Sequence, residues 1–162
     1  DIFKKYGEEK FAKKIALSIV KYRQTKSIET SKDLAEIIKQ SVPKRLQFLK
    51  IHPATRVFQA LRIAVNGELD NLKSALRQSV SVLKIGGRIA VISFHSLEDR
   101  LVKQYFEESS RSCVCPPKFP VCRCEHTAIF KKVTKKAVVP EESEKTSNPR
   151  SRSARLRVAE KI

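Results

Sequence analysis

A histidine stands directly after a strand-like run near the middle of the chain. Residues Arg88–Ile92 are rich in β-forming types, follow a Gly86-Gly87 turn and lead into the string Phe94–Arg100, which contains His95. Open α/β sheets form their ligand crevices at the carboxyl ends of strands, so we take His95 as the candidate catalytic residue, within a substrate pocket. An imidazole there could hydrogen-bond a substrate or take up a proton. The alternative is a histidine that fixes its own loop through hydrogen bonds to the backbone.

Four cysteines form two close pairs in the loop 111–126. Cysteine sulfur and histidine nitrogen are preferred zinc ligands, so this loop is a candidate zinc knuckle, with His126 close behind it. A single residue between paired cysteines is tighter than the usual spacing of structural zinc sites, and reduced thiols without a metal are the alternative. The candidate ligands are Cys113, Cys115, Cys122 and Cys124.

The charge balance favours a polyanionic partner. The 162-residue chain has 34 lysines and arginines against 17 aspartates and glutamates, a formal net charge of +17. Basic groups that neutralise phosphates release condensed counterions, so nucleic acid is the expected partner. The candidate RNA-binding residues are Arg56, Gln59 and Arg62 on one expected helix, and Arg150, Arg152 and Arg155 near the carboxyl end. Ordinary solvated charge on a helix, and charges that keep an edge strand from aggregating, are the respective alternatives.

Hydropathy gives no indication of a membrane partner. No apolar run approaches the roughly 20 residues that span a bilayer. The first residues also lack the apolar core of a signal peptide. We therefore expect a cytoplasmic protein with reduced cysteines.

Four segments, taken together, resemble one family: the bacterial small-subunit ribosomal RNA cytosine-N4 methyltransferases (RsmH, also called MraW). The segments are Tyr6-Gly7-Glu8-Glu9 followed by a basic helix, His52 to Ile63, Ile92 to Arg100, and Asn148 to Arg157, in the family's order. The resemblance implies S-adenosylmethionine as methyl donor and small-subunit ribosomal RNA, or the small ribosomal subunit, as partner. It also implies that the loop of His95 lies beside the cleft that the target base enters.

The glycine pattern of a methyl-donor site is missing from this chain. The family binds S-adenosylmethionine through a glycine-rich turn, whereas this chain has only Gly7, Gly67, Gly86 and Gly87 and no G-x-G pattern. We therefore expect a carboxyl-terminal portion of such an enzyme, without cofactor-binding residues and inactive alone. A function of another class, a non-enzymatic RNA-binding module built on a zinc knuckle, is the alternative.

The expected fold class is α/β. Residues 1–50 are expected to be helical, as part of the family's inserted helical domain. We expect an apolar stripe at helical spacing that includes Phe11, Ile15 and Ile19, and a capping box formed by Thr30 and Asp33. Residues 51–162 are expected to form the second half of a class I, Rossmann-like methyltransferase domain. Within it we expect a capping box at Ser96 and Asp99, a loop over 140–153 and a final edge strand over 154–159.

Overall fold

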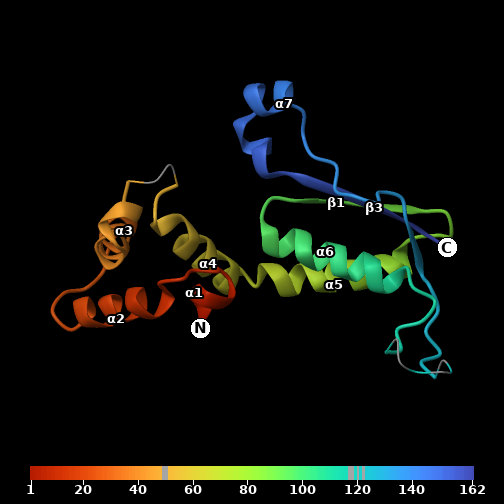
Figure 1. Ribbon diagram of the computed structural model, residues 1–162, viewed down its shortest axis with the longest axis horizontal. Coiled ribbons are helices and arrows are strands. Elements are labelled where there is room, and N and C mark those ends of the chain that lie inside the picture. Colours follow the sequence, from red (N-terminus) through yellow and green to blue (C-terminus); the bar gives the residue numbers. More distant parts are fainter. Residues whose placement is uncertain (49–50, 117–118, 120, 122) are drawn as a thin grey trace. The chain divides into compact units, whose positions relative to one another are not determined.

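The structure is a computed structural model that describes residues 1–48, 51–116, 119, 121 and 123–162 (Figure 1). The chain divides into two units, Asp1–Glu68 and Leu69–Ile162. The boundary falls later than the expected position near residue 50, because the helix that begins at Ala54 packs against helices of the first unit.

The described part of the first unit is helical. Its α2 carries the apolar stripe that the sequence predicts, and Ile15 of that stripe is fully buried. The predicted capping box is confirmed: the Thr30 hydroxyl accepts from the Asp33 N–H at 3.1 Å, and the Asp33 carboxylate accepts from the Thr30 N–H at 3.0 Å. The elements are α1 (Ile2–Lys5), α2 (Ala12–Arg23), α3 (Ser31–Ser41), the 3₁₀ turn η1 (Lys44–Leu46) and α4 (Ala54–Asn66).

Helix α4 closes the core of the first unit. Its buried residues recur at helical spacing and pack against α1 and α3, with Ile15 and Ile38 among the buried residues of the same core. The helix ends where Gly67 takes the left-handed conformation, at φ 61°, which costs glycine little. The buried positions of α4 are Ala54, Val57, Ala60 and Ile63.

The second unit combines helices with one small sheet. Helices α5 and α6 lie side by side in this unit (Figure 1). Both contribute to its core, where Leu76, Val102 and Phe106 are buried together. Lys161 donates from Nζ to the carbonyls of Val80 and Leu83, which are acceptors at the carboxyl end of α5. The elements are α5 (Glu68–Val82), β1 (Arg88–Ser93), α6 (Ser96–Ser109), β2 (Phe130–Lys132), α7 (Glu142–Ser147), η2 (Pro149–Ser153) and β3 (Arg155–Lys161).

The last strand is central in the described sheet, so the predicted edge strand is wrong. The strand order is β1-β3-β2, and β3 pairs antiparallel with both neighbours. Strands β1 and β2 therefore run parallel to each other, and α6 lies in the connection between them. Edge position cannot be inferred from alternation alone, because pairing on both sides depends on distant segments. The predicted loop over 140–153 is also corrected, since it contains α7 and η2.

The two faces of the sheet differ. Ile89 and Val91 pack into the core with α5 and α6, as expected for a buried strand, and Ala159 lies opposite Ile89 in the register. The alternate residue Ile92 is 58% exposed on the other face. One face of the sheet is thus covered by helices, while the other presents apolar side chains.

Among the described residues, no helix combines the length and the apolar character needed to cross a membrane.

Candidate functional site

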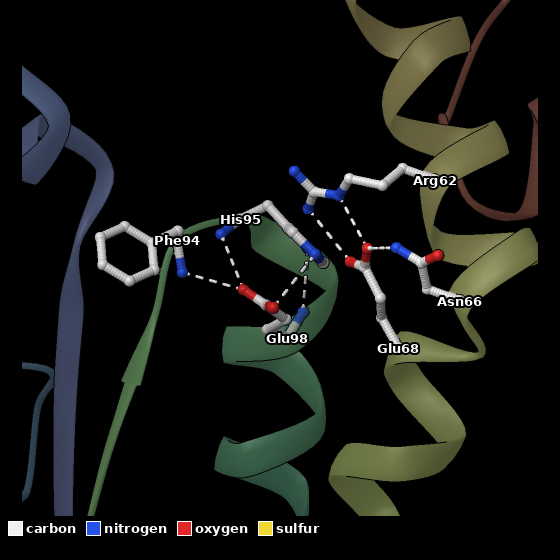
Figure 2. A network of polar contacts seen from close by, with 6 residues as sticks. All are labelled: Arg62, Asn66, Glu68, Phe94, His95 and Glu98. Atoms are coloured by element: carbon white, nitrogen blue, oxygen red, sulfur yellow. Dashed lines mark hydrogen bonds and ion pairs between the residues drawn. The ribbon is translucent and has the colours of Figure 1, made fainter.

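His95 begins helix α6 and caps it. Its Nδ1 accepts from the Glu98 N–H at 3.3 Å, and the Glu98 carboxylate accepts from the backbone N–H groups of Phe94 and His95 at 2.9 and 3.2 Å (Figure 2). The expected capping box therefore lies one residue earlier than Ser96 and Asp99, because His95 supplies the acceptor at the helix start. These contacts are those of a histidine that fixes its own loop.

Asp99 turns away from the helix end and joins a buried ion pair. Arg157 of β3 donates to the two Asp99 oxygens at 2.7 and 3.2 Å, and Arg155 adds a third bond at 3.2 Å. The hydrogen bond from Arg157 holds the pKa of Asp99 below its usual value, against the opposing effect of burial. Since the side chains of Asp99 and Arg157 are only 11% and 12% exposed, this pair ties α6 to the sheet.

Arg62, an expected RNA-binding residue, is engaged within its own unit. Its guanidinium donates to both oxygens of Glu68 at 2.7 and 3.0 Å, and Asn66 donates to the same carboxylate at 3.2 Å (Figure 2). A bidentate pair of this kind orients the guanidinium. Arg62 would have to rearrange this pairing, or share it, to reach a phosphate.

Arg56 lines a cavity of about 570 Å³ in the first unit. Lys10 and Arg45 add two further basic residues to its wall, which also includes His52 and one acidic residue, Glu9. Apolar groups, including Phe11, complete the lining. A concave site with basic and apolar walls suits a phosphate with an attached ring, which is the chemistry of a nucleotide.

Gly7 explains how two of the sequence segments depend on each other. A Cβ at Gly7 would lie 2.7 Å from the Phe3 carbonyl oxygen and 2.8 Å from the Arg56 carbonyl oxygen, both backbone atoms. Only glycine allows this approach without a backbone shift. The glycine of the Tyr6–Glu9 string therefore brings that string against the Arg56 turn of α4.

The carboxyl-terminal arginines divide into two kinds. Arg150 and Arg152 are exposed on η2, whereas Arg155 is bonded to Asp99. Gln59, the remaining residue of the expected RNA-binding set, is half-buried on α4. The structure does not arrange the arginines as one row on an extended segment, because η2 coils the chain before β3 begins.

Three of the four candidate zinc ligands lie together. The sulfur atoms of Cys113, Cys115 and Cys124 are all within 4.8 Å of one another. Cys122 lies outside the described residues. His126 is not in this group, and its Nε2 instead lies 3.1 Å from the Glu108 carbonyl oxygen.

The sequence patterns missed Arg157, Lys10 and Arg45. Arg157 stands with Arg150, Arg152 and Arg155 in the basic carboxyl-terminal segment, and nothing in the sequence indicates that its partner is Asp99. Lys10 and Arg45 lie far from Arg56 in sequence, and only helix packing brings them to one cavity. The basic residue directly after the Tyr6–Glu9 string was the one available signal.

Comparison with known proteins agrees with the resemblance. All 162 residues match the MraW methylase family. Ribosomal RNA small subunit methyltransferase H of Halothermothrix orenii is 55% identical over the whole chain, which spans 52% of that relative. The proteins of the same name from Geobacter sp. strain M21 and Caldicellulosiruptor bescii are 53% and 52% identical over 99% of the chain, again 52% of each relative. The chain thus spans about half the length of these relatives, as expected for a portion of a longer protein, and it belongs to the MraW methylase family.

Proposed function

We propose that the protein containing this chain transfers a methyl group from S-adenosylmethionine to the N4 amine of a cytidine in small-subunit ribosomal RNA. The observation that carries the proposal is the family match over residues 1–162, together with relatives named for methylation of that RNA. The net charge of +17 suits an RNA substrate. The alternative of a non-enzymatic RNA-binding module receives no support from these relatives.

We infer that the small sheet is part of a larger class I, Rossmann-like sheet. Parallel strands β1 and β2 with α6 in their connection are the βαβ unit of α/β proteins. The exposed side chains Ile92 and Phe94, 58% and 55% accessible, are suited to burial under further elements of such a domain.

The turn between β1 and α6 does not fit an S-adenosylmethionine site. Strand β1 leads to α6 through Phe94 and His95, without the glycine-rich turn that allows a ligand close to the backbone. The N–H groups at the start of α6 already donate to His95 and Glu98. We therefore propose that the methyl donor binds elsewhere in the protein.

We propose that this chain contributes the RNA-binding surface. Lys10, Arg45 and Arg56 offer three positive groups around one cavity, and Arg150 and Arg152 add two exposed guanidinium groups on the second unit. Contacts of this kind attach the phosphate backbone without reading its sequence. Specificity for one cytidine would then come from the pocket that receives the base.

We propose that His95 belongs to that pocket as a positioning residue. By capping α6, it holds the loop between β1 and the helix in one conformation. Its Nδ1 accepts a hydrogen bond, so the neutral ring carries its proton on Nε2. That Nε2 lies 3.4 Å from a carboxylate oxygen of Glu98, so a hydrogen bond from Nε2 to the cytosine, which stays a prediction, would have to replace or share this contact.

The decisive test uses the complete protein and small subunits that lack the modification. With labelled S-adenosylmethionine we expect label in N4-methylcytidine after digestion of the RNA to nucleosides. The 162-residue chain alone should transfer no label and should show no cofactor binding by calorimetry. Label in a different nucleoside, or none with the complete protein, would overturn the proposed reaction.

A charge-reversal pair tests the RNA surface. Arg150→Glu should weaken binding of small-subunit RNA and reduce its salt dependence, because Arg150 is exposed on η2. Lys145→Glu changes the net charge equally on the neighbouring helix α7, but Lys145 is already neutralised by Glu142 at 2.6 Å. If both variants weakened RNA binding equally, the effect would be due to net charge alone, and a defined contact between Arg150 and RNA would be contradicted.

A further inference from the structure

We propose that Cys113, Cys115 and Cys124 form a zinc site that closes the loop between α6 and β2. Cys113 and Cys115 come from one short segment of that loop and Cys124 from another, and the structure places the three sulfur atoms within 4.8 Å of one another. Soft thiolate ligands in such a cluster select zinc among the common biological divalent ions.

The spacing of the sulfurs suits a tetrahedral metal. Zinc binds thiolate sulfur at about 2.3 Å, so two thiolates on a tetrahedral zinc lie about 3.8 Å apart. The Cys113 and Cys124 sulfurs are 3.7 Å apart. That distance is far longer than a disulfide bond, so the two sulfurs are not joined to each other.

Each sulfur of the cluster also receives a backbone N–H. Val114 N–H lies 3.4 Å from the Cys124 sulfur, Cys115 N–H lies 3.4 Å from the Cys113 sulfur, and Arg123 N–H lies 3.4 Å from the Cys115 sulfur. Donors aimed at sulfur stabilise the negative charge that a thiolate ligand carries and hold it in place. The two segments thus bond to each other through their ligand atoms.

The described apolar side chains near the tip of this loop are exposed. Val114, Phe119 and Val121 are 45%, 55% and 67% exposed, so apolar burial contributes little there. Its base is tied to α6, where the Ile129 N–H donates to the Ser109 carbonyl. A metal that binds only the closed loop would stabilise it, because the ligands come together only in the folded loop and the free energy of metal binding then adds to that of folding.

Elemental analysis of protein purified without chelators, with zinc chloride in the growth medium, tests the site. We expect close to one zinc per chain. The double variant Cys113→Ser/Cys124→Ser should retain less than a tenth of it, whereas Val121→Ser, in the same loop and exposed, should retain it all. His126→Ala should also keep the zinc, since that ring faces Glu108.

A second measurement keeps the test independent of variant folding. Titration of the unmodified protein with a mercurial thiol reagent should release the zinc in step with loss of the thiols. Removal of zinc should in turn speed tryptic cleavage after Arg123. Zinc-free protein, a Cys113–Cys124 disulfide found by mass spectrometry, or zinc retained by the double variant would each overturn the assignment.

Discussion

Helices α4 and α6 both begin beside a histidine that accepts a backbone hydrogen bond, but they are held to their units by different forces. In each, a histidine Nδ1 accepts a backbone N–H: His52 from Ala54 at 3.2 Å, and His95 from Glu98 at 3.3 Å. Helix α6 is then fixed by charge, through Asp99 and the arginines of β3. Helix α4 is fixed by a close backbone approach at Gly7.

This difference has a functional consequence. In the first turn of α6, Glu98 caps the helix and Asp99 forms ion pairs within the unit. At α4, packing through Gly7 involves no charge, and Arg56 remains on the wall of a basic cavity. The charged side chain of Arg56 is therefore not needed to hold α4 in place and can contact a ligand, whereas the charge of Asp99 serves to hold α6 to the sheet.

The largest expected effect is the loss of Asp99. Asp99→Ala leaves the buried Arg157 guanidinium without its carboxylate, and removing one partner of a buried pair costs about 3–5 kcal/mol of unfolding free energy. Urea unfolding followed by circular dichroism measures it. The control is Glu107→Ala, also on α6, which removes a half-exposed ion pair between Glu107 and Lys132 of β2. This variant should lower the unfolding free energy by less than about 1 kcal/mol. Equal effects would remove the distinction between the two helix starts.

Acid should partly reproduce that loss. Because the folded pKa of Asp99 is lowered, its ion pair contributes stability above the unfolded pKa of about 3.9, and this contribution disappears as pH falls through the folded pKa. The stability difference between the parent protein and Asp99→Asn should therefore shrink below about pH 4. Urea midpoints measured from pH 7 to pH 3 test this, and a constant difference would contradict it.

Gly7→Ala should cause the next largest loss of unfolding free energy. The added methyl group meets two backbone oxygens that cannot rotate away, so α1 and α4 must separate, at a cost of about 1–3 kcal/mol. Unlike the Asp99 effect, this loss should not depend on pH. Lys4→Ala, at an exposed position of α1, is the control and should stay within about 0.5 kcal/mol. An unchanged Gly7→Ala protein would show that the close approach is not required.

The smallest effects should come from the two histidines at these helix starts. His95→Ala should cost about 1 kcal/mol, and His52→Ala less, because only His95 is the N-cap of its helix and has a reciprocal glutamate, whereas His52 precedes the N-cap Pro53. Asparagine is a good cap, so His95→Asn should recover most of the stability. If methylation by the complete protein is nevertheless lost in His95→Asn, the ring itself serves the substrate pocket. Full activity would limit His95 to capping.

Local patterns in the sequence were sufficient for the elements whose signals are local. The stripe of α2, the Thr30–Asp33 box, the strand over Arg88–Ile92 and the helix after it follow from periodicity and capping chemistry. The four segments that carry the resemblance were likewise sufficient to identify the family, which the match over the whole chain confirms. These inferences need no knowledge of which segments meet in space.

Only the tertiary structure decided which of two neighbouring acids caps α6, where β3 lies in the sheet and which basic groups share a cavity. Asp99 and Arg157 are 58 residues apart, and their pairing depends on β3 lying beside β1. Gly7 matters because a turn of α4 passes it at backbone distance. The physical reason is the same in each case: sequence spacing determines which face of an element a side chain occupies, while its partner is determined by the packing of segments far apart in the chain.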